Sequence, residues 1–266
     1  MPQTLAIIIP AYKANFLRQA LQSIAEQTCK KFKLYIGDDA SPDNIEEIVK
    51  QFENRIDIVY YRFDKNLGRQ NLTKQWERCI SLSQGEEYIW LFSDDDIMSP
   101  KAVDDFYKAL RIYKHDLYRF NIQPIDEAGD VIGKRTHHPD IEDVNDFMIR
   151  RLRGETLSFA CEYIFSRNVF CETGGFISFP LAWGSDDATW FKLGKNGGIC
   201  TIGPATIYWR LSGENVTSLE SNNKLKFRSI LLFSRWLLNQ EVTYEIRRAI
   251  PHSILRQTRI LKIGLV

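Results

Sequence analysis

The chain has 266 residues, a length that suits one large α/β domain or two small ones. Apolar residues make up 44% and charged residues 26% of the sequence, which excludes a disordered or a fibrous protein. Lysine and arginine number 35 against 34 aspartates and glutamates, and this balance argues against a dedicated nucleic-acid-binding protein. The sequence is therefore that of a globular protein with an ordinary core.

The sequence also bears on membrane insertion, secretion and the state of the cysteines. No apolar run reaches the roughly 18 to 20 residues that a membrane-spanning helix needs. The opening MPQTLAIIIP has neither the basic start nor the apolar length of a signal peptide. Five scattered cysteines without a C-x-x-C pair are typical of reduced thiols, and not of a disulfide framework or a zinc site. We therefore expect a cytoplasmic protein.

The first 113 residues alternate between strand patterns and helix patterns. Continuous apolar runs predict strands buried on both faces, and apolar residues spaced three or four apart predict helices. Strands are expected at Leu5–Ile9, Phe32–Ile36, Ile56–Phe63 and Tyr88–Phe92, with helices over 15–28, from Ser41, over 70–82 and from Pro100. This alternation predicts a parallel sheet covered by helices on both faces.

After about residue 115 the alternation becomes weaker. Strand-like pieces occur at Leu117–Ile122 and Glu162–Phe165, whereas 222–266 has a helical and basic pattern. Residues 225–266 hold eight lysines and arginines against two glutamates, which gives a local charge of +6. We divide the chain into 1–115, 116–221 and a basic helical extension over 222–266.

An acidic turn follows the second predicted strand. Ligands of an open parallel sheet collect beyond the carboxyl ends of its strands, and Asp38 and Asp39 stand at such an end. One interpretation is that the segment only caps the next helix, through Ser41 or Asp43. The other is that one of two adjacent, mutually repelling carboxylates accepts a hydrogen bond from a ligand, such as the N3–H of uracil.

A second acidic turn, Ser93-Asp94-Asp95-Asp96, follows the fourth predicted strand. Three successive carboxylates are costly without a counter-charge. Mg²⁺ or Mn²⁺ would supply one, because these ions prefer oxygen ligands and bridge carboxylates to substrate phosphates. The alternative is a solvated turn stabilised by the dipole of the helix that follows. Spacing alone favours neither interpretation.

Four segments in this order resemble the family 2 inverting glycosyltransferases with the GT-A fold: IIIPAY, IGDDASPD, KNLGRQN and FSDDDIMSP. The resemblance covers roughly residues 5–113 and extends more weakly to about 215. It implies an α/β fold with a Rossmann-like nucleotide-binding half. A mostly parallel central sheet with helices on both faces, an acceptor-side half and C-terminal helices complete the expected architecture.

The resemblance also implies which residues bind the donor nucleotide. These are Pro10, Ala11, Tyr12, Asp38, Asp39, Arg69 and Asp94. Tyr12 is expected to pack against the base, Asp39 to accept its N3–H, and Arg69 to contact the diphosphate, since guanidinium matches phosphate oxygens. An ordinary surface position is the alternative for Tyr12 and for Arg69.

A metal site is implied at Asp94, Asp95 and Asp96, with Mn²⁺ or Mg²⁺ as the cofactor. The family pattern reads Asp-x-Asp-Asp before an apolar residue, and Ser93 stands where its first Asp falls. Asp94 is expected to substitute for that residue. Asp95 is the ligand that the pattern supports best.

The acceptor side resembles the family at two further segments. Gly174-Gly175-Phe176 matches its glycine turn, and the segment that begins at Trp183 and reads WGSDDATW matches the one that holds the catalytic base. Ser185 replaces the usual Glu. The register places Asp186 at the base, with Asp187 as the rival, and a helix cap is the structural alternative. Asn215-Val216-Thr217-Ser218 weakly resembles a loop that closes over the diphosphate.

The expected function is transfer of a sugar, with inversion, from a nucleotide diphosphate donor, UDP-linked for preference, to a hydroxyl of a glycan or lipid-linked acceptor. Bacterial surface polysaccharide synthesis is the expected context. Two alternatives are a sugar-nucleotide-binding protein without catalysis and a nucleotidyltransferase. Pro10-Ala11-Tyr12 lacks the glycine-rich turn that nucleotidyltransferases and NAD enzymes use. The basic C-terminal region is expected either to contact a membrane or partner, or to pack on the core.

Overall fold

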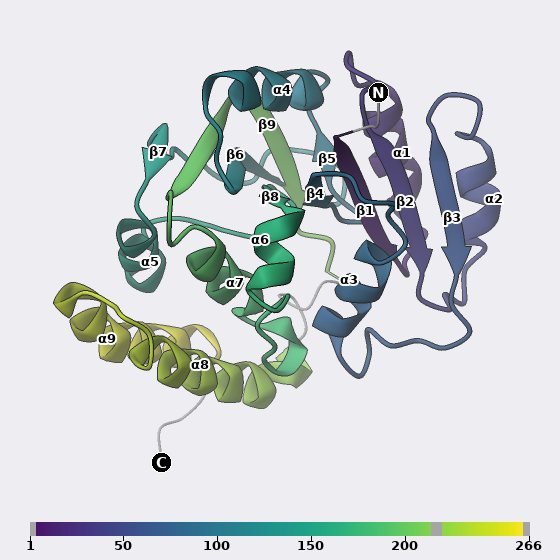
Figure 1. Cartoon of the computed structure of the whole chain (residues 1–266). Helices are drawn as coiled ribbons and strands as arrows, with labels where there is room; N and C mark the ends of the chain where they lie inside the picture. Colours follow the sequence, from purple (N-terminus) through teal and green to yellow (C-terminus); the bar gives the residue numbers. More distant parts are fainter. Residues whose placement is uncertain (1–3, 214–219, 263–266) are drawn as a thin grey trace.

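The structure is a computed structural model, and it describes residues 4–213 and 220–262. Its centre is one sheet in which neighbouring strands follow the order β3-β2-β1-β4-β8-β6-β9-β5, with β7 paired to β9 (Figure 1). The strands are β1 (Leu5–Ala11), β2 (Lys33–Asp38), β3 (Ile58–Arg62), β4 (Tyr88–Leu91), β5 (Ile97–Met98), β6 (Leu117–Ile125), β7 (Ile141–Glu142), β8 (Tyr163–Ser166) and β9 (Ile199–Arg210). The first four pair in parallel, so the expected parallel sheet is confirmed for the N-terminal half.

Helices cover both faces of this sheet. One face carries α1 (Leu17–Ala25), α2 (Ile45–Lys50) and α4 (Ala102–Ile112); the other carries α3 (Leu72–Ile80), α5 (Val144–Arg153), α6 (Arg167–Glu172) and α7 (Ser185–Leu193). The second half enters the same sheet with mixed polarity, because β8 pairs antiparallel with both β4 and β6, whereas β6 and β9 pair in parallel. The fold is therefore mixed α/β around a single sheet.

Strand β1 shows why the sheet is buried on both faces. Its side chains alternate, so Leu5, Ile7 and Ile9 pack into one apolar cluster while Ala6 and Ile8 pack into the other. All five side chains are fully buried. This explains the continuous apolar run in the sequence and fixes the carboxyl end of β1 at the edge of the site.

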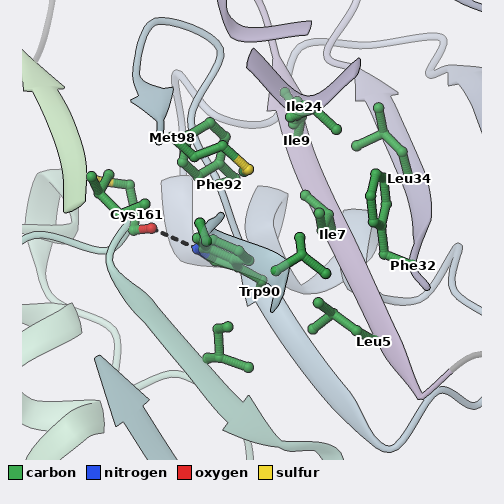
Figure 2. Close-up of a cluster of buried hydrophobic side chains, with 14 of the residues drawn as sticks. Leu5, Ile7, Ile9, Ile24, Phe32, Leu34, Trp90, Phe92, Met98 and Cys161 are labelled. Atoms are coloured by element: carbon green, nitrogen blue, oxygen red, sulfur yellow. Dashed lines mark hydrogen bonds between the residues drawn. The ribbon is translucent and has the colours of Figure 1, made fainter. Parts of the chain in front are cut away.

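Trp90 links the two halves of the molecule at the level of β4. Its indole Nε1–H donates to the backbone oxygen of Cys161 at 2.7 Å (Figure 2). Its ring stacks on that of Phe120 of β6, with the ring centres 5.0 Å apart. Trp90 is fully buried, so its polar N–H requires such a partner. The contact holds the segment before β8 against the end of β4.

The C-terminal region forms a pair of helices, α8 (Asn223–Leu238) and α9 (Tyr244–Ile260), which lie together at the end of the molecule away from α2 (Figure 1). They pack on α5, α7 and the short 3-10 turn Pro180–Ala182. Leu237, Ile246 and Ile250 are buried in the same cluster as α5 and α7. Packing on the core is thus confirmed for one face of this pair. Across the described ranges, 4–213 and 220–262, no helix is long and apolar enough to cross a membrane.

Candidate active site

Two adjacent chambers lie at the carboxyl ends of β1, β2 and β4. The larger chamber has a volume of about 820 Å³, and the smaller chamber about 320 Å³. They share five lining residues, namely Leu72, Trp76, Ser93, Ala160 and Trp209. Two groups of predicted site residues line the two chambers. Asp186 and Asp187, the predicted catalytic residues, line the smaller chamber, and the larger one is lined by the predicted donor residues Pro10, Ala11, Tyr12, Asp39, Arg69 and Asp94 and by the predicted metal ligand Asp95. The sequence motifs from both halves therefore meet in one cleft.

Asp94 organises the backbone at the end of β1. Its Oδ2 accepts hydrogen bonds from the backbone N–H groups of Tyr12 at 2.9 Å and Lys13 at 3.0 Å. The hydroxyl of Ser41 donates to the backbone oxygen of Tyr12. The backbone of Tyr12 is thus held from two sides, and the residue, which is 43% exposed, lies on the wall of the larger chamber. An aromatic face in this position suits a planar base.

Asp95 faces the same chamber and has two side-chain partners. Its Oδ2 lies 3.0 Å from Nζ of Lys13 and accepts a hydrogen bond from the hydroxyl of Ser212 at 2.9 Å. Nζ of Lys13 also lies 4.0 Å from Oδ1 of Asp94. Burial, followed by the charge of Asp95, raises the pKa of Asp94 to about 6. Two carboxylates and one ammonium group thus share this end of the chamber.

The structure sets Asp96 apart from these two carboxylates. Its side chain is buried, and Oδ1 accepts the backbone N–H of Arg210 at 2.8 Å. Burial and the charge of Asp95 raise the pKa of Asp96 to about 7. Successive side chains of a turn point in different directions, and Asp96 points away from the chamber. Among the residues that the structure describes, no three acids, histidines or cysteines gather in a geometry that could hold a metal.

The remaining acids can still hold a divalent ion. Mg²⁺ keeps several waters and is usually bound by one or two carboxylates together with substrate phosphates. Asp94 and Asp95 are two hard oxygen donors on one chamber wall, and burial, followed by the charge of Asp95, raises the pKa of Asp94. These residues therefore fit a divalent ion that takes its other ligands from a diphosphate and water.

The first acidic turn receives its counter-charges from within the chain. Asp38 is fully buried and does not line the chamber; its Oδ2 lies 2.6 Å from Nη1 of Arg62 and accepts the hydroxyl of Tyr60. Asp39 lines the chamber and forms an ion pair with Arg78. The expected repulsion is thus relieved by two arginines, and the structure does not place Asp38 with the donor residues.

Asp39 also shapes the loop that carries Arg69. Its carboxylate accepts the backbone N–H groups of Leu67 at 2.7 Å and Gly68 at 2.8 Å. A Cβ at Gly68 would lie 2.7 Å from Oδ2 of Asp39, so glycine allows this close approach. The loop is therefore fixed to the end of β2, and the exposed Arg69 lines the larger chamber.

Asp186 and Asp187 both stand in the first turn of α7, but they differ in their partners. Asp187 is engaged by Arg151 of α5: Nε lies 3.0 Å from Oδ1 and 3.1 Å from Oδ2, and Nη2 lies 2.6 Å from Oδ2. The guanidinium also donates to the backbone oxygen of Thr156. Asp187 is thus held as one half of a bidentate ion pair. Asp186 has no such arginine bound to it and faces the smaller chamber.

The environment of Asp186 disfavours its ionised form. Burial, and then the charge of Asp187, raise the pKa of Asp186 to about 7. Glu162 lies near it, and burial raises the pKa of that carboxyl well above its ordinary value. Ser185, which replaces the family's Glu, is fully buried and accepts the backbone N–H of Phe179 at 2.9 Å. That position therefore serves the local fold.

Sequence reasoning missed several residues of this cleft, notably Lys13, Arg151 and Ser212. Lys13 follows a predicted donor residue directly, so its place beside the second acidic turn could have been inferred. Arg151 and Ser212 lie far in sequence from the aspartates that they contact, and no local pattern marks them. The expected closing loop at Asn215–Ser218 lies outside the described residues.

Solved structures with the same arrangement of elements define the class of fold. TarS of Staphylococcus aureus, solved in complex with UDP-GlcNAc, matches with a TM-score of 0.74 at 17% identity, over 98% of this chain and 76% of that one. The mannosyltransferase PcManGT of Pyrobaculum calidifontis, solved with GDP-Man and Mn²⁺, matches with a TM-score of 0.60 at 15% identity, over 99% and 76%. The expected GT-A fold is confirmed.

The sequence itself identifies the family. The profile of Glycosyl transferase family 2 matches residues 6–172, more than half of the chain, and the chain belongs to this family. An uncharacterized glycosyltransferase of Rickettsia conorii is 29% identical over 197 residues. The match covers 71% of this chain and 31% of that protein, so the chain spans about a third of the length of this curated relative.

Proposed function

We propose that the protein transfers a sugar, with inversion, from a nucleoside diphosphate donor bound in the larger chamber to a hydroxyl of an acceptor bound in the smaller one. The observation that carries this proposal is that the two chambers are adjacent and share five lining residues, with Asp94 and Asp95 in one and Asp186 in the other. Residues 1–115 would then form the donor half and 116–221 the acceptor half. UDP is the nucleotide that we favour, as in the TarS complex.

Each part of the donor has a matching group in the larger chamber. The ring of Tyr12 offers a face for the base, beside Asp39. Both oxygens of Asp39 already accept backbone N–H groups, and Arg78 pairs with it. A fourth donor, the N3–H of uracil, can still bind, because a carboxylate has about four acceptor sites. Arg69 and Lys13 bring positive charge to the diphosphate.

The reaction needs a base on one side of the sugar and charge stabilisation on the other. The acceptor oxygen attacks the anomeric carbon and gives its proton to the carboxylate of Asp186, while the bond from that carbon to the diphosphate oxygen breaks. A divalent ion held by Asp94 and Asp95 would neutralise the charge that grows on the departing diphosphate. A single displacement inverts the anomeric centre, and no covalent intermediate on the protein is needed.

Asp186 is better suited to this role than Asp187. A base must be free to take a proton, and the carboxylate of Asp187 is occupied by the bidentate contact with Arg151. A pKa of Asp186 raised to about 7 matches a group that accepts a proton near neutral pH. A cytoplasmic site of action and a role in surface polysaccharide synthesis fit the resemblance and form part of the proposal.

The decisive experiment measures donor binding and donor turnover separately. Sugar nucleotides with UDP, GDP and CMP are compared by thermal shift, with and without Mn²⁺, and slow hydrolysis of the best binder is followed. Binding together with hydrolysis that Asp186→Asn abolishes supports the transferase. Binding without hydrolysis or transfer would indicate a protein that only binds sugar nucleotides. Release of pyrophosphate from a nucleoside triphosphate would indicate a nucleotidyltransferase.

A further inference from the structure

The two faces of α8 have opposite surroundings. Toward the domain, Ile230, Phe233 and Ser234 line the smaller chamber, and Leu237 is fully buried. Lys226 also turns inward, with Nζ 5.1 Å from the centre of the Trp183 ring. The opposite face consists of exposed residues that recur every three or four positions: Lys224, Leu225, Arg228, Leu231, Leu232, Arg235 and Leu238. We refer to these seven residues as the outer face of α8.

The outer face combines apolar and cationic side chains and contains no acid. Its four leucines are 37% to 45% exposed. A single exposed leucine is ordinary on a protein surface, whereas four in one stripe on a 16-residue helix form a patch that calls for a partner. The ion pairs within the described part of the chain engage none of the three cations of this face. Their charge is therefore available to an external anionic surface.

Helix α9 lies beside α8 and adds charge of the same sign (Figure 1). Arg247, Arg248 and Arg259 are exposed, together with Tyr244 and Ile260, which are 68% and 60% exposed. The exposed residues of α9 also include one acid, Glu245. The helix pair thus presents basic residues interleaved with aliphatic and aromatic side chains. This composition is typical of helices that lie in the interface of a membrane with anionic lipids.

We propose that the outer face of α8 docks on an anionic lipid bilayer. The leucines would enter the boundary between headgroups and acyl chains, and the arginines and Lys224 would contact lipid phosphates. The complementary charge favours this partner over a second copy of the chain, which would bring like charges together. This proposal rests on the proposed function in one respect. It takes the acceptor of the sugar to be attached to a lipid in the membrane on which α8 docks.

The acceptor side of the cleft supports this point. Ser253 and Gln257 of α9 and Phe233 of α8 line the smaller chamber, which also contains Asp186. An α-helix with its side chains is about 10 to 12 Å thick, so the outer face of α8 lies within one helix diameter of that chamber. Docking of the outer face would therefore bring a sugar carried on a lipid headgroup close to the chamber that Asp186 lines.

The test is co-sedimentation with vesicles, using phosphatidylcholine alone or with 30% phosphatidylglycerol. The wild type is compared with Lys224→Gln/Arg228→Gln/Arg235→Gln and with Leu231→Ser/Leu232→Ser. A matched control, Lys31→Gln/Lys101→Gln/Arg111→Gln, removes the same charge from exposed positions outside the C-terminal helices. We expect binding to anionic vesicles, a loss on the order of 100-fold in the charge variant, and no loss in the control. The leucine variant should lose binding as well.

Three outcomes would overturn the proposal. These are equal binding to both kinds of vesicle, equal losses in the charge variant and the control, and a dimer in solution that the leucine variant abolishes. Urea unfolding and UDP binding serve as measures of folding for every variant and should not change. Donor hydrolysis without vesicles is independent of docking, so its absence would remove the proposed function, whereas vesicle binding would still decide whether the outer face docks.

Discussion

The ammonium group of Lys13 lies 3.0 Å from Oδ2 of Asp95, one of the two carboxylates that face the larger chamber. A divalent ion bound by either oxygen of Asp95 would lie close to this ammonium group, and the two positive charges would repel each other. Lys13 therefore neutralises this end of the chamber before any ion binds, and it opposes binding of the ion. Once displaced, its charge stays near the diphosphate, where it can stabilise the leaving group.

Replacement of Lys13 by methionine should strengthen binding of the metal and weaken binding of the nucleotide. Without the ammonium group, Asp94 and Asp95 repel each other more strongly and attract a cation more strongly. We expect affinity for Mn²⁺ in the presence of UDP to rise on the order of 10-fold, since partly buried ion pairs contribute modestly. Titration followed by the paramagnetic signal of free Mn²⁺ measures this directly. Weaker Mn²⁺ binding in Lys13→Met would show that Lys13 helps to hold the ion.

Asp95 and Asp96 should respond differently to substitution, although they are neighbours. Asp95→Ala removes a chamber-facing ligand, so turnover should fall more than about 100-fold and Mn²⁺ affinity should fall with it. Asp96→Asn keeps an oxygen for the backbone N–H of Arg210 and should retain Mn²⁺ affinity. Full activity in excess chelator, or equal losses of Mn²⁺ affinity in both variants, would refute the assignment of the ion to Asp94 and Asp95.

The sequence predicted the N-terminal half of the fold well because its signals are local. A strand buried on both faces is a continuous apolar run, as in Leu5–Ile9, and the turn that follows each strand is adjacent to it in sequence. The second half lacks such signals. Strand β9 contains Gly203 and Pro204, and α5 carries three arginines in its last turn, so neither pattern indicated a regular element.

The sequence predicted where the candidate site residues lie in the fold better than it predicted their side-chain contacts. Tyr12, Asp95 and Asp186 stand where the motifs placed them, at a strand end or in the first turn of a helix. The direction of each side chain depends on partners far along the chain. Arg62 forms an ion pair with Asp38 outside the chamber, and Arg151 forms one with Asp187. The spacing of residues within a motif predicts neither contact.

The rate of transfer should increase with pH through neutrality. The base must be ionised, and the pKa of Asp186 is raised to about 7, so below that pH kcat/KM should fall about 10-fold per unit. Asp187 on the same helix, Arg151 from α5 and the buried Glu162 face this carboxyl. The pH profile should lose this limb in Asp186→Asn. An unchanged limb in that variant would assign the titration to another group.

The raised pKa of Asp186 makes the stability of the fold decrease with pH, whereas it makes the transfer rate increase. Asp186 keeps its proton in the folded chain to about pH 7, whereas in the unfolded chain it ionises near its ordinary pKa of 3.8. The unfolded state therefore binds fewer protons between these values, and stability decreases as pH rises through that window. Asp186→Asn removes this cost, so its free energy of unfolding should exceed that of the wild type at pH 8 and approach it at pH 4. Urea unfolding at the two pH values measures the difference, and a variant less stable than the wild type at pH 8 would contradict it.

Asp186→Asn and Asp187→Asn, compared side by side, should separate the base from its structural neighbour. Asp186→Asn should fold and bind UDP normally, and transfer should fall by the 10²- to 10⁴-fold that is typical of losing general-base assistance. Asp187→Asn instead leaves the guanidinium of Arg151 buried without its carboxylate. Breaking a buried pair in this way costs about 3 to 5 kcal/mol, and the partial exposure of Arg151 favours the lower value.

The expected pattern is therefore a chemical defect in one variant and a stability defect in the other. Unfolding free energy, UDP affinity and transfer rate are measured for both, with the rate corrected for the fraction of folded protein. If Asp187→Asn abolishes transfer while its unfolding free energy is unchanged, the base is Asp187 and the ion pair with Arg151 must open during the reaction. If both variants lose UDP affinity and stability together, the first turn of α7 is structural and the base lies elsewhere.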